Sequence, residues 1–310
     1  MTKMNVGIFR AKTKKFSRKI LHILCYLLLI DLAFIFLYPF LYMIVTSVKS
    51  YSDINNLSVN WVPTSFNWEN YVLAAEAMKI QYGIVNSIIV TGLATIGHVL
   101  SCSFIGYGFA RFTFPFKKVL FFGVILSATI PIQTMIIPLY ITYSNLGMID
   151  TFVPLVLPTY LGFGLRGGIF IFLYRQYFLG FPRALEEAAL IDGCGRMRSF
   201  FRIAMPSAGP ATVVCLVLSM VWHWNDYYEP SVYLSASEKR ALVPQMLPNL
   251  YQWISNITAS DMQGTEQMVT LYHSGVVMAA TFIAILPLLI VYAFLQKKFM
   301  VSVEHSGLVG

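Results

Sequence analysis

The sequence predicts an all-α protein that crosses a membrane several times, and three observations lead to this fold class. Of the 310 residues, 57% are hydrophobic and only 12% are charged, about half the charged fraction of an ordinary soluble domain. Apolar runs of about 20 residues, the length that a helix needs to cross the hydrocarbon core, recur along the chain. Lys and Arg residues gather in alternate connections between these runs.

Six apolar runs are long enough to be transmembrane helices. They cover residues 20–48, 84–108, 119–142, 152–174, 209–229 and 275–296. Prolines inside several runs, such as Pro131, Pro158 and Pro287, each remove a helix hydrogen bond and predict bends. Bent helices are tolerated in lipid where protein or water satisfies the exposed backbone, so the bends indicate either a solute path or ordinary kinked packing.

The distribution of Lys and Arg predicts which side of the membrane each end of the chain occupies. These residues are abundant in the N-terminal segment and in the connections 109–118 and 175–208, but sparse in the other long connections. Because positive charge is retained on the cytoplasmic side, we expect both termini to be cytoplasmic. The expected division is a cytoplasmic segment 1–19, a first transmembrane helix 20–48, an extracellular loop 49–83, a core domain 84–296 that includes an extracellular loop 230–274, and a cytoplasmic tail 297–310.

The net charge of +8 is explained by this topology and by contact with inner-leaflet lipid, and it does not indicate a nucleic acid partner. The sequence has no G-x-x-x-x-G-K-[ST] loop for ATP phosphates and no H-E-x-x-H motif, and its histidines lack the spacing of metal ligands. We therefore expect no catalytic residue, no metal and no cofactor in this chain. A transport function would draw its energy from a partner or from an ion gradient.

A charged segment, EEAALIDGCGRMRSFFRIAMP at 186–206, interrupts the apolar pattern in the longest cytoplasmic connection. Pro182 suits the first turn of a helix, and Glu186 and Glu187 then lie in its early turns, near the positive end of the helix dipole. Ala188 and Ala189 keep one surface of this helix narrow. The segment therefore predicts a helix that another protein can approach closely.

A turn and a second short helix complete this segment. Asp192 and Gly193 form a turn signal. The second helix is expected over 195–204, with Phe200 and Phe201 presented on its surface, and it should end before Pro206. The alternative from the residues alone is an amphipathic helix that lies on the membrane, with its arginines reaching the headgroups.

The segment resembles the EAA loop of ATP-binding-cassette (ABC) importer permeases, in which Glu-Ala-Ala is followed after three residues by Gly and after nine more by Ile-x-Leu-Pro. The corresponding residues here are Glu187, Ala188, Ala189, Gly193, Ile203 and Pro206. Met205 replaces the usual Leu, a volume-conserving change. Further segments resemble the carbohydrate-uptake, maltose-type branch of the family, in particular its smaller permease subunit. They are YGFAR at 107–111, PIQTMIIPLY at 131–140, FLYRQYF at 172–178, WNDYYEP at 224–230 and FLQKKF at 294–299.

The resemblance implies the type I ABC importer permease fold and a multi-pass protein of the bacterial cytoplasmic membrane. It implies a permease that translocates a sugar, of oligosaccharide size, while two cytoplasmic ABC ATPase subunits bind ATP and Mg²⁺. The other partners that it implies are a second homologous permease, in a heterodimer with this chain, and an extracellular solute-binding protein, which is a lipoprotein in a single-membrane bacterium.

The resemblance also assigns a role to the loop 182–206, as the coupling helix that docks on an ATPase. Glu187 is implied to pair with a basic residue of that ATPase, and Gly193 to allow the turn. The residues of this coupling site are Glu186, Glu187, Ala188, Ala189, Asp192, Gly193, Phe200, Ile203 and Pro206.

Candidate residues of the sugar path are polar or aromatic side chains within or beside the spans, since aromatic faces, amides and carboxyl groups recognise sugars. The candidates are Gln133, Arg166, Asn225, Asp226 and Tyr227. Structural alternatives remain open for each of them. The aromatic residues around 222–228 can instead form an interfacial belt. Arg166 can pair with Asp31 or Asp226, or line an inner vestibule. Gln133 can form a helix–helix hydrogen bond.

Two other functions remain open at this point. One is an ABC permease for a non-sugar solute, such as a phosphonate, a polyamine or a peptide. The other is a secondary transporter driven by protons or sodium, which should show inverted repeats and an intramembrane carboxylate relay. The sequence shows no evident repeat and only the isolated Asp31 and Asp226 near its spans.

Overall fold

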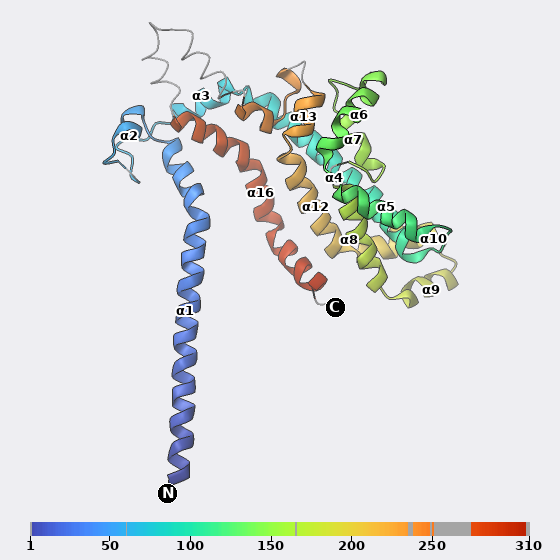
Figure 1. The fold of residues 1–310 in the computed structure, drawn as a ribbon, viewed down its shortest axis with the longest axis horizontal. Helices are drawn as coiled ribbons and strands as arrows, with labels where there is room; N and C mark the ends of the chain where they lie inside the picture. The colour runs from blue at the N-terminus through green and yellow to red at the C-terminus, as the bar shows by residue number, and fades with distance from the viewer. Residues whose placement is uncertain are drawn as a thin grey trace.

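The computed structural model describes residues 2–59, 61–164, 166–234, 238–248, 250 and 274–307, with side chains between 19 and 302 within these ranges. All regular secondary structure in this part of the chain is helical, which confirms the all-α prediction. Figure 1 shows a long N-terminal helix and, to one side of it, a bundle built from the other long helices.

The first half of the chain contains α1 (Thr2–Ser47), α2 (Tyr51–Asn55), α3 (Glu69–Ala77), α4 (Ile80–Arg111), α5 (Lys117–Thr129), α6 (Ile132–Asn145) and α7 (Val153–Tyr160). The second half contains α8 (Gly167–Gly180), α9 (Arg183–Ile191), α10 (Arg196–Ser199), the π-helix η1 (Phe200–Ala204), α11 (Met205–Ser207), α12 (Gly209–Trp224), α13 (Tyr228–Tyr233), the 3₁₀-helix η2 (Glu238–Arg240) and α16 (Ser274–Gly307).

Three of the described helices are long and apolar enough to cross a membrane: Lys19–Ser47 within α1, the whole of α4, and Ser274–Ser302 within α16. Two helix pairs meet the same criteria together but are bent, α5 with α6 by 100° and Arg196–Ser207 with α12 by 75°. The described residues therefore hold three candidate spans, or up to five if each bent pair is one span. The predicted total of six spans and the cytoplasmic termini stay predictions.

The predicted run 119–142 is not one helix, because it breaks between α5 and α6 at Pro131, which cannot donate a helix hydrogen bond. Hydroxyl groups satisfy carbonyls on both sides of this corner. Ser127 donates to Val124 at 2.7 Å, and Thr134 donates to Pro131 itself at 2.7 Å. The corner therefore holds polar groups that a continuous helix would have enclosed in its own hydrogen bonds.

The predicted run 152–174 is also divided, into α7 and α8. Residues in the intervening turn have positive φ angles that a helix cannot contain. They are Gly162 at 73°, Gly164 at 90° and Arg166 at 59°. The run 209–229 is shorter than predicted, since α12 ends at Trp224.

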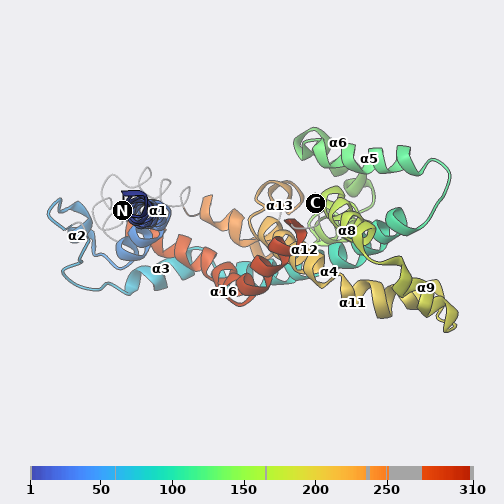
Figure 2. The ribbon, with the colours of Figure 1, turned by 90° about the horizontal axis from the view of Figure 1, so that it is seen from below.

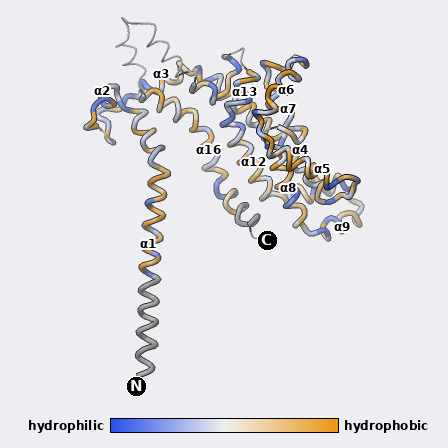
Figure 3. The backbone as a smooth tube through the Cα atoms, viewed as in Figure 1, coloured by the Kyte–Doolittle hydropathy of each residue, from blue (hydrophilic) through white to orange (hydrophobic). Residues whose placement is uncertain are grey.

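α1 stands apart from the bundle along most of its length, and only its C-terminal end lies beside α16 (Figure 1). None of the most apolar window of its candidate span is buried. Figure 3 shows apolar residues along the upper half of this helix. Because such a surface is stable only against lipid or protein, α1 is built to contact the membrane or another chain.

α4 is the central helix of the bundle and packs against α7, α8 and α12. Gly106 allows a close approach to α8, because a Cβ atom there would lie 2.7 Å from the Cβ of Tyr174. Around this contact, Phe170, Tyr174 and Phe178 are fully buried. In the perpendicular view of Figure 2, α5 and α6 lie on one side of the bundle and α11 and α16 on the other.

Candidate functional site

The segment 182–206 forms the predicted helix, turn and second helix. α9 ends in a turn closed by two backbone hydrogen bonds, from Cys194 to Ala189 at 2.8 Å and from Gly193 to Leu190 at 3.1 Å. This pairing is the Schellman motif, which needs a left-handed residue at the position of Gly193. The φ of Gly193 is 81°, so a glycine is favoured here for conformational reasons.

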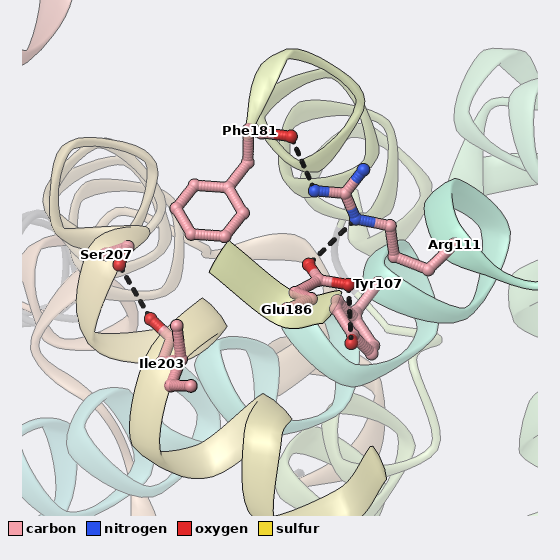
Figure 4. A network of polar contacts seen from close by, with 6 residues as sticks. All are labelled: Tyr107, Arg111, Phe181, Glu186, Ile203 and Ser207. Atoms are coloured by element: carbon pink, nitrogen blue, oxygen red, sulfur yellow. Dashed lines mark hydrogen bonds and ion pairs between the residues drawn. The ribbon is translucent and has the colours of Figure 1, made fainter. Parts of the chain in front are cut away.

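Glu186 points inward and fixes α9 to the end of α4. The Arg111 Nε donates to Glu186 Oε1 at 2.9 Å, and the Tyr107 hydroxyl donates to Oε2 at 3.2 Å. Arg111 also donates to the Phe181 carbonyl at 2.6 Å, just before α9 (Figure 4). The two charged side chains are only 5% and 13% exposed. The predicted coupling residue Glu186 therefore uses its carboxylate within the chain.

Arg111 and Tyr107 are functional neighbours that sequence reasoning missed. Both lie in the segment YGFAR, whose resemblance to a family gives no sign of a contact with the loop. The sequence held one signal for this contact. Arg111 is a basic residue just after the predicted run 84–108, in the last turn of α4, where the helix dipole favours a cation that can also pair with a carboxylate.

The opposite face of α9 is exposed. Glu187 and Ala188 lie on it, and the apolar side chains Leu185 and Ile191 are 51% and 86% exposed. Ala189 instead faces the protein and is buried. An exposed face that joins a carboxylate to uncovered apolar side chains, on a firmly anchored helix, is suited to docking against another protein.

The expected surface position of Phe200 is wrong. Phe200 is only 2% exposed, and its ring lies 5.0 Å from that of Tyr107 and 5.5 Å from that of Phe104, centroid to centroid. Phe201 is exposed, as expected. An apolar ring at the base of a protruding loop gains more from burial than from water, so Phe200 supports the loop from within.

The second helix does not end before Pro206, which corrects the predicted boundary. A π-helix over 200–204 widens the turn, so that the Met205 N–H reaches the carbonyl of Phe200, five residues earlier. The Ser207 hydroxyl donates to the Ile203 carbonyl at 2.7 Å, and the Tyr177 hydroxyl donates to the Ser207 carbonyl (Figure 4 shows the first of these). The wider turn and these hydroxyls accommodate the proline within a helical path.

The candidate sugar-path residues are divided among several elements. Gln133 is exposed in the first turn of α6, and Arg166 is exposed before α8. The Arg166 guanidinium lies 4.6 Å from the ring centroid of Trp222, and within the described residues it forms no ion pair with Asp31 or Asp226. Arg166 is therefore held by a cation–π contact.

The structure brings the other three candidates together in the turn between α12 and α13. Asn225 donates to the Val221 carbonyl at 2.8 Å, and Asp226 Oδ1 accepts from the backbone N–H of Tyr228 at 3.1 Å. The Asn225 side chain thus bonds to the end of α12, and the Asp226 side chain accepts from the first N–H groups of α13, whose N-cap residue is Tyr227. Tyr227 is 48% exposed and has the freest aromatic face of the three.

Beside this turn lies Glu229, a buried carboxyl group that sequence reasoning missed. Burial, with a smaller contribution from the nearby Asp226, raises the pKa of Glu229 to about 8. Burial also raises the pKa of Asp226, to about 6, against the lowering effect of its backbone hydrogen bonds. The Glu229 Oε1 atom has no hydrogen-bond partner among the described residues. The segment after α12 therefore carries two neighbouring carboxyl groups whose protonated forms are favoured.

Taken together, a helical bundle with candidate spans and a protruding, anchored loop define a membrane-transport component. Residues 102–300 match the model of a family described as binding-protein-dependent transport system inner membrane component. The chain belongs to this family, whose members are the membrane-embedded permeases of ABC importers.

Individual relatives cover nearly the whole chain. A probable starch degradation products transport system permease protein, AmyC of Thermoanaerobacterium thermosulfurigenes, is 31% identical over 88% of this chain and 92% of its own length. The diacetylchitobiose uptake system permease protein NgcG of Streptomyces coelicolor is 29% identical over 90% of this chain and 86% of its own. The fold is similar to a chain of a bacterial ABC transporter involved in the import of the acidic polysaccharide alginate, with a TM-score of 0.75, 22% identity, and coverage of 91% of this chain and 98% of that one.

Proposed function

We propose that this chain is one of two membrane subunits of an ABC importer and that it moves a sugar of oligosaccharide size into the cell. The observation that carries the proposal is the loop 182–206, where an exposed carboxylate, Glu187, stands on a helix that Glu186 and Arg111 fix to the bundle. The names of the relatives support a sugar as the substrate, since they include permeases for starch degradation products and for diacetylchitobiose.

In this proposal the loop docks on one of two cytoplasmic ATPase subunits, which bind ATP and Mg²⁺. Glu187 pairs with a basic residue of the ATPase, and the small side chain of Ala188 lets the two surfaces approach closely. Movement of the ATPase then reaches the bundle by two routes. One runs through Glu186 and Arg111 into α4, and the other runs through η1 and α11 into α12.

The proposed topology has six spans, with the segments 1–19 and 297–310 in the cytoplasm. An extracellular solute-binding protein then delivers the sugar to the loops 49–83 and 230–274, of which residues 60, 235–237, 249 and 251–273 lie outside the described residues. The second, homologous permease completes a heterodimer. Its contact accounts for the apolar surface of α1, which this chain leaves uncovered.

Among the candidate path residues, Tyr227 is the strongest choice for a sugar contact, because its aromatic face is exposed. Gln133 offers an exposed amide on α6, and Arg166 offers an exposed guanidinium beside Trp222. Asn225 and Asp226 are assigned to the shape of the turn that presents Tyr227, since their side chains already bond to the backbone.

The test is purification of the chain from its native membrane, identification of the proteins that accompany it, and reconstitution of that complex in vesicles. We expect a second permease, an ATPase and a solute-binding protein. ATP-dependent uptake should then be measured with a panel of labelled maltooligosaccharides, arabinooligosaccharides and chitobiose derivatives.

The possible outcomes separate the proposed function from its alternatives. ATP-dependent uptake of an oligosaccharide supports the proposal. ATP-dependent uptake of a phosphonate, polyamine or peptide alone would keep the ABC permease and reject the sugar. Uptake by the chain alone, driven by an ion gradient without ATP, would make it a secondary transporter.

A further inference from the structure

Positive charge collects where the first residues of α5 and α9 meet the side of α8. Lys117 begins α5, Arg183 begins α9, and Arg175 lies on α8 between them. The charges of Arg175 and Arg183 both act on the Lys117 ammonium group. In the described part of the chain none of these three forms an ion pair, whereas nearby Arg111 is neutralised by Glu186. These three like charges, named here the cationic cluster, therefore have no ion-pair partner among the described residues.

The side chains of the cationic cluster are held close together by their surroundings. Lys117 and Phe121 lie one turn apart on the same face of α5. The Arg175 guanidinium is 4.1 Å from the ring centroid of Phe121, so it lies over a side chain one turn from Lys117. Lys117 donates to the Phe112 carbonyl at 2.8 Å, which uses one of its three N–H donors. Lys117 and Arg175 are thus held in place, while most of the N–H donors of the cluster have no acceptor among the described residues.

Two further features of this region favour an anion. The Arg175 Nε atom is buried, and no described residue accepts a hydrogen bond from it. The N-cap residue of α5, Phe116, has no side chain that caps the helix, and within the first turn only the N–H group of Lys117 has a backbone acceptor among the described residues, the Phe114 carbonyl at 3.4 Å. The positive end of a helix dipole adds to the attraction of an anion such as a phosphate.

The surface next to the cationic cluster is apolar. α5 has no buried residue, and its side chains Val119, Leu120 and Phe122 are 65%, 54% and 66% exposed. Figure 2 shows α5 on the outer side of the bundle. A cationic site at the start of a helix whose other faces are apolar and exposed matches a molecule with a phosphate at one end and hydrocarbon at the other.

We propose that Lys117, Arg175 and Arg183 bind the phosphate group of an anionic phospholipid of the cytoplasmic leaflet, whose acyl chains lie along α5. The assignment to this leaflet rests on the proposed topology. A bound phosphate would neutralise the repulsion within the cluster and would join the start of α9 to α5 and α8. The lipid would thereby stiffen the base of the loop 182–206, next to the Glu186–Arg111 pair.

The experiment uses the chain purified with its accompanying subunits in nanodiscs that contain equal amounts of phosphatidylglycerol and phosphatidylcholine. Native mass spectrometry then measures the ratio of the two lipids that stay bound. The variant Lys117→Gln/Arg183→Gln is compared with the control Lys118→Gln/Arg198→Gln, which removes the same charge from two exposed residues. We expect the ratio to fall about fivefold for each charge lost from the cluster, and the control to keep the ratio of the unmodified chain.

Each outcome decides for or against the lipid site. A ratio equal to that of the control overturns it, and so does displacement of the lipid by inorganic phosphate, which would indicate a free-anion site. Loss of a protein subunit with an unchanged lipid ratio would make the cluster a protein interface and also overturn the proposal. The charge-retaining variant Lys117→Arg/Arg183→Lys should keep the lipid and controls for folding. ATP-dependent uptake is measured separately, so the proposed function is tested independently of the lipid site.

Discussion

At the scale of single residues, two adjacent glutamates in the loop have different surroundings. Glu186 is nearly buried and bonds to Arg111 and Tyr107, whereas Glu187 is exposed on the other side of α9. Successive residues on a helix point about 100° apart, which is enough to separate an anchoring carboxylate from a docking one. The same chemical group therefore serves stability at one position and, in the proposed function, recognition at the next.

Replacing the exposed glutamate should impair transport without impairing the fold. In Glu187→Ala we expect ATP-dependent uptake to fall about tenfold or more, because one partner of a charge pair at the ATPase contact is lost. The thermal unfolding temperature of the isolated subunit should stay unchanged, since the side chain is exposed. Uptake equal to that of the unmodified complex would contradict the coupling role of Glu187.

Replacing Glu186, the nearly buried glutamate, should instead lower the stability of the fold. Glu186→Ala leaves Arg111 buried without its partner, and we expect a loss of about 3–5 kcal/mol in the free energy of unfolding. Thermal unfolding of the purified subunit measures this loss. The double variant Arg111→Met/Glu186→Leu removes both charges and should recover most of it. A double variant less stable than Glu186→Ala would argue against an unpaired charge as the cause.

The carboxyl groups after α12 predict a dependence of the stability of the fold on pH. The folded state raises the pKa of Glu229 from 4.5 to about 8, so it holds a proton that the unfolded chain releases. Stability is therefore full below about pH 4.5 and falls as the pH rises towards 8. The neighbouring titratable groups are Asp226, Tyr143 and Tyr233, of which Asp226 acts in the same direction between 3.8 and about 6.

Thermal unfolding at pH 5.5 and pH 8.5 tests this dependence. Glu229→Gln imitates the protonated group, so we expect the variant to be more stable than the unmodified chain at the higher pH, by about 1 kcal/mol or more. Glu76→Gln, at an exposed carboxylate of α3, is the matched control and should leave the dependence unchanged. An identical pH dependence in Glu229→Gln would reject Glu229 as the titrating group.

At the scale of elements, the turn after α9 depends more on Gly193 than on Gly195. Gly193 has a φ of 81°, whereas Gly195 has a φ of −61°. A Cβ atom added at either position would meet no atom within 4 Å, so the difference between them is one of backbone conformation alone. The pair thus offers a test that separates conformational strain from steric overlap.

Gly193→Ala should destabilise the loop by about 1–2 kcal/mol, the cost of a left-handed conformation for a residue with a side chain. Gly195→Ala should be neutral. Hydrogen exchange of the α9 and Cys194 amides measures the difference directly, because the Schellman hydrogen bonds protect these groups. Equal protection in both variants would show that the turn does not require the left-handed conformation.

Much of the element structure could be predicted from the sequence, and the exceptions have physical causes. The lengths of apolar runs located α1, α4 and α16, and Asp192-Gly193 located the turn of the loop. The breaks within 119–142 and 152–174 were not located, because composition reports how apolar a run is and not whether its backbone is continuous. The π-helix before Pro206 was missed for a similar reason, since one wider turn leaves no periodic signal.

The candidate site was predicted less completely than the elements. The loop and its exposed residues could be found from local spacing. The partner of Glu186 could not, because Arg111 is 75 residues away along the chain and only the packing of α4 brings it near. Phe200 was misplaced because adjacent aromatic residues give no information about which of them faces the bundle. Glu229 was overlooked because its burial depends on tertiary contacts.

At the scale of the whole molecule, the proposed orientation can be read from the native cysteines. Cys102 and Cys215 are buried, Cys25 lies in the candidate span of α1, and Cys194 lies in the turn after α9, outside the candidate spans. A thiol reagent that cannot cross membranes should therefore label Cys194 in inside-out vesicles and not in intact cells. Cys194→Ser is the control for the site of labelling. Labelling of Cys194 in intact cells would reverse the proposed topology.

The corner at Pro131 has a consequence for how a cell must produce this protein. α5 has 13 residues, and at 1.5 Å per residue it is about 20 Å long, shorter than the ~30 Å hydrocarbon layer. In the proposed topology the corner at Pro131 therefore lies within the hydrocarbon layer. In the proposed assembly, water in the path or the second permease covers its open backbone groups. We therefore expect the two permeases to be synthesised in equal amounts, because a copy without its partner would be degraded by membrane proteases.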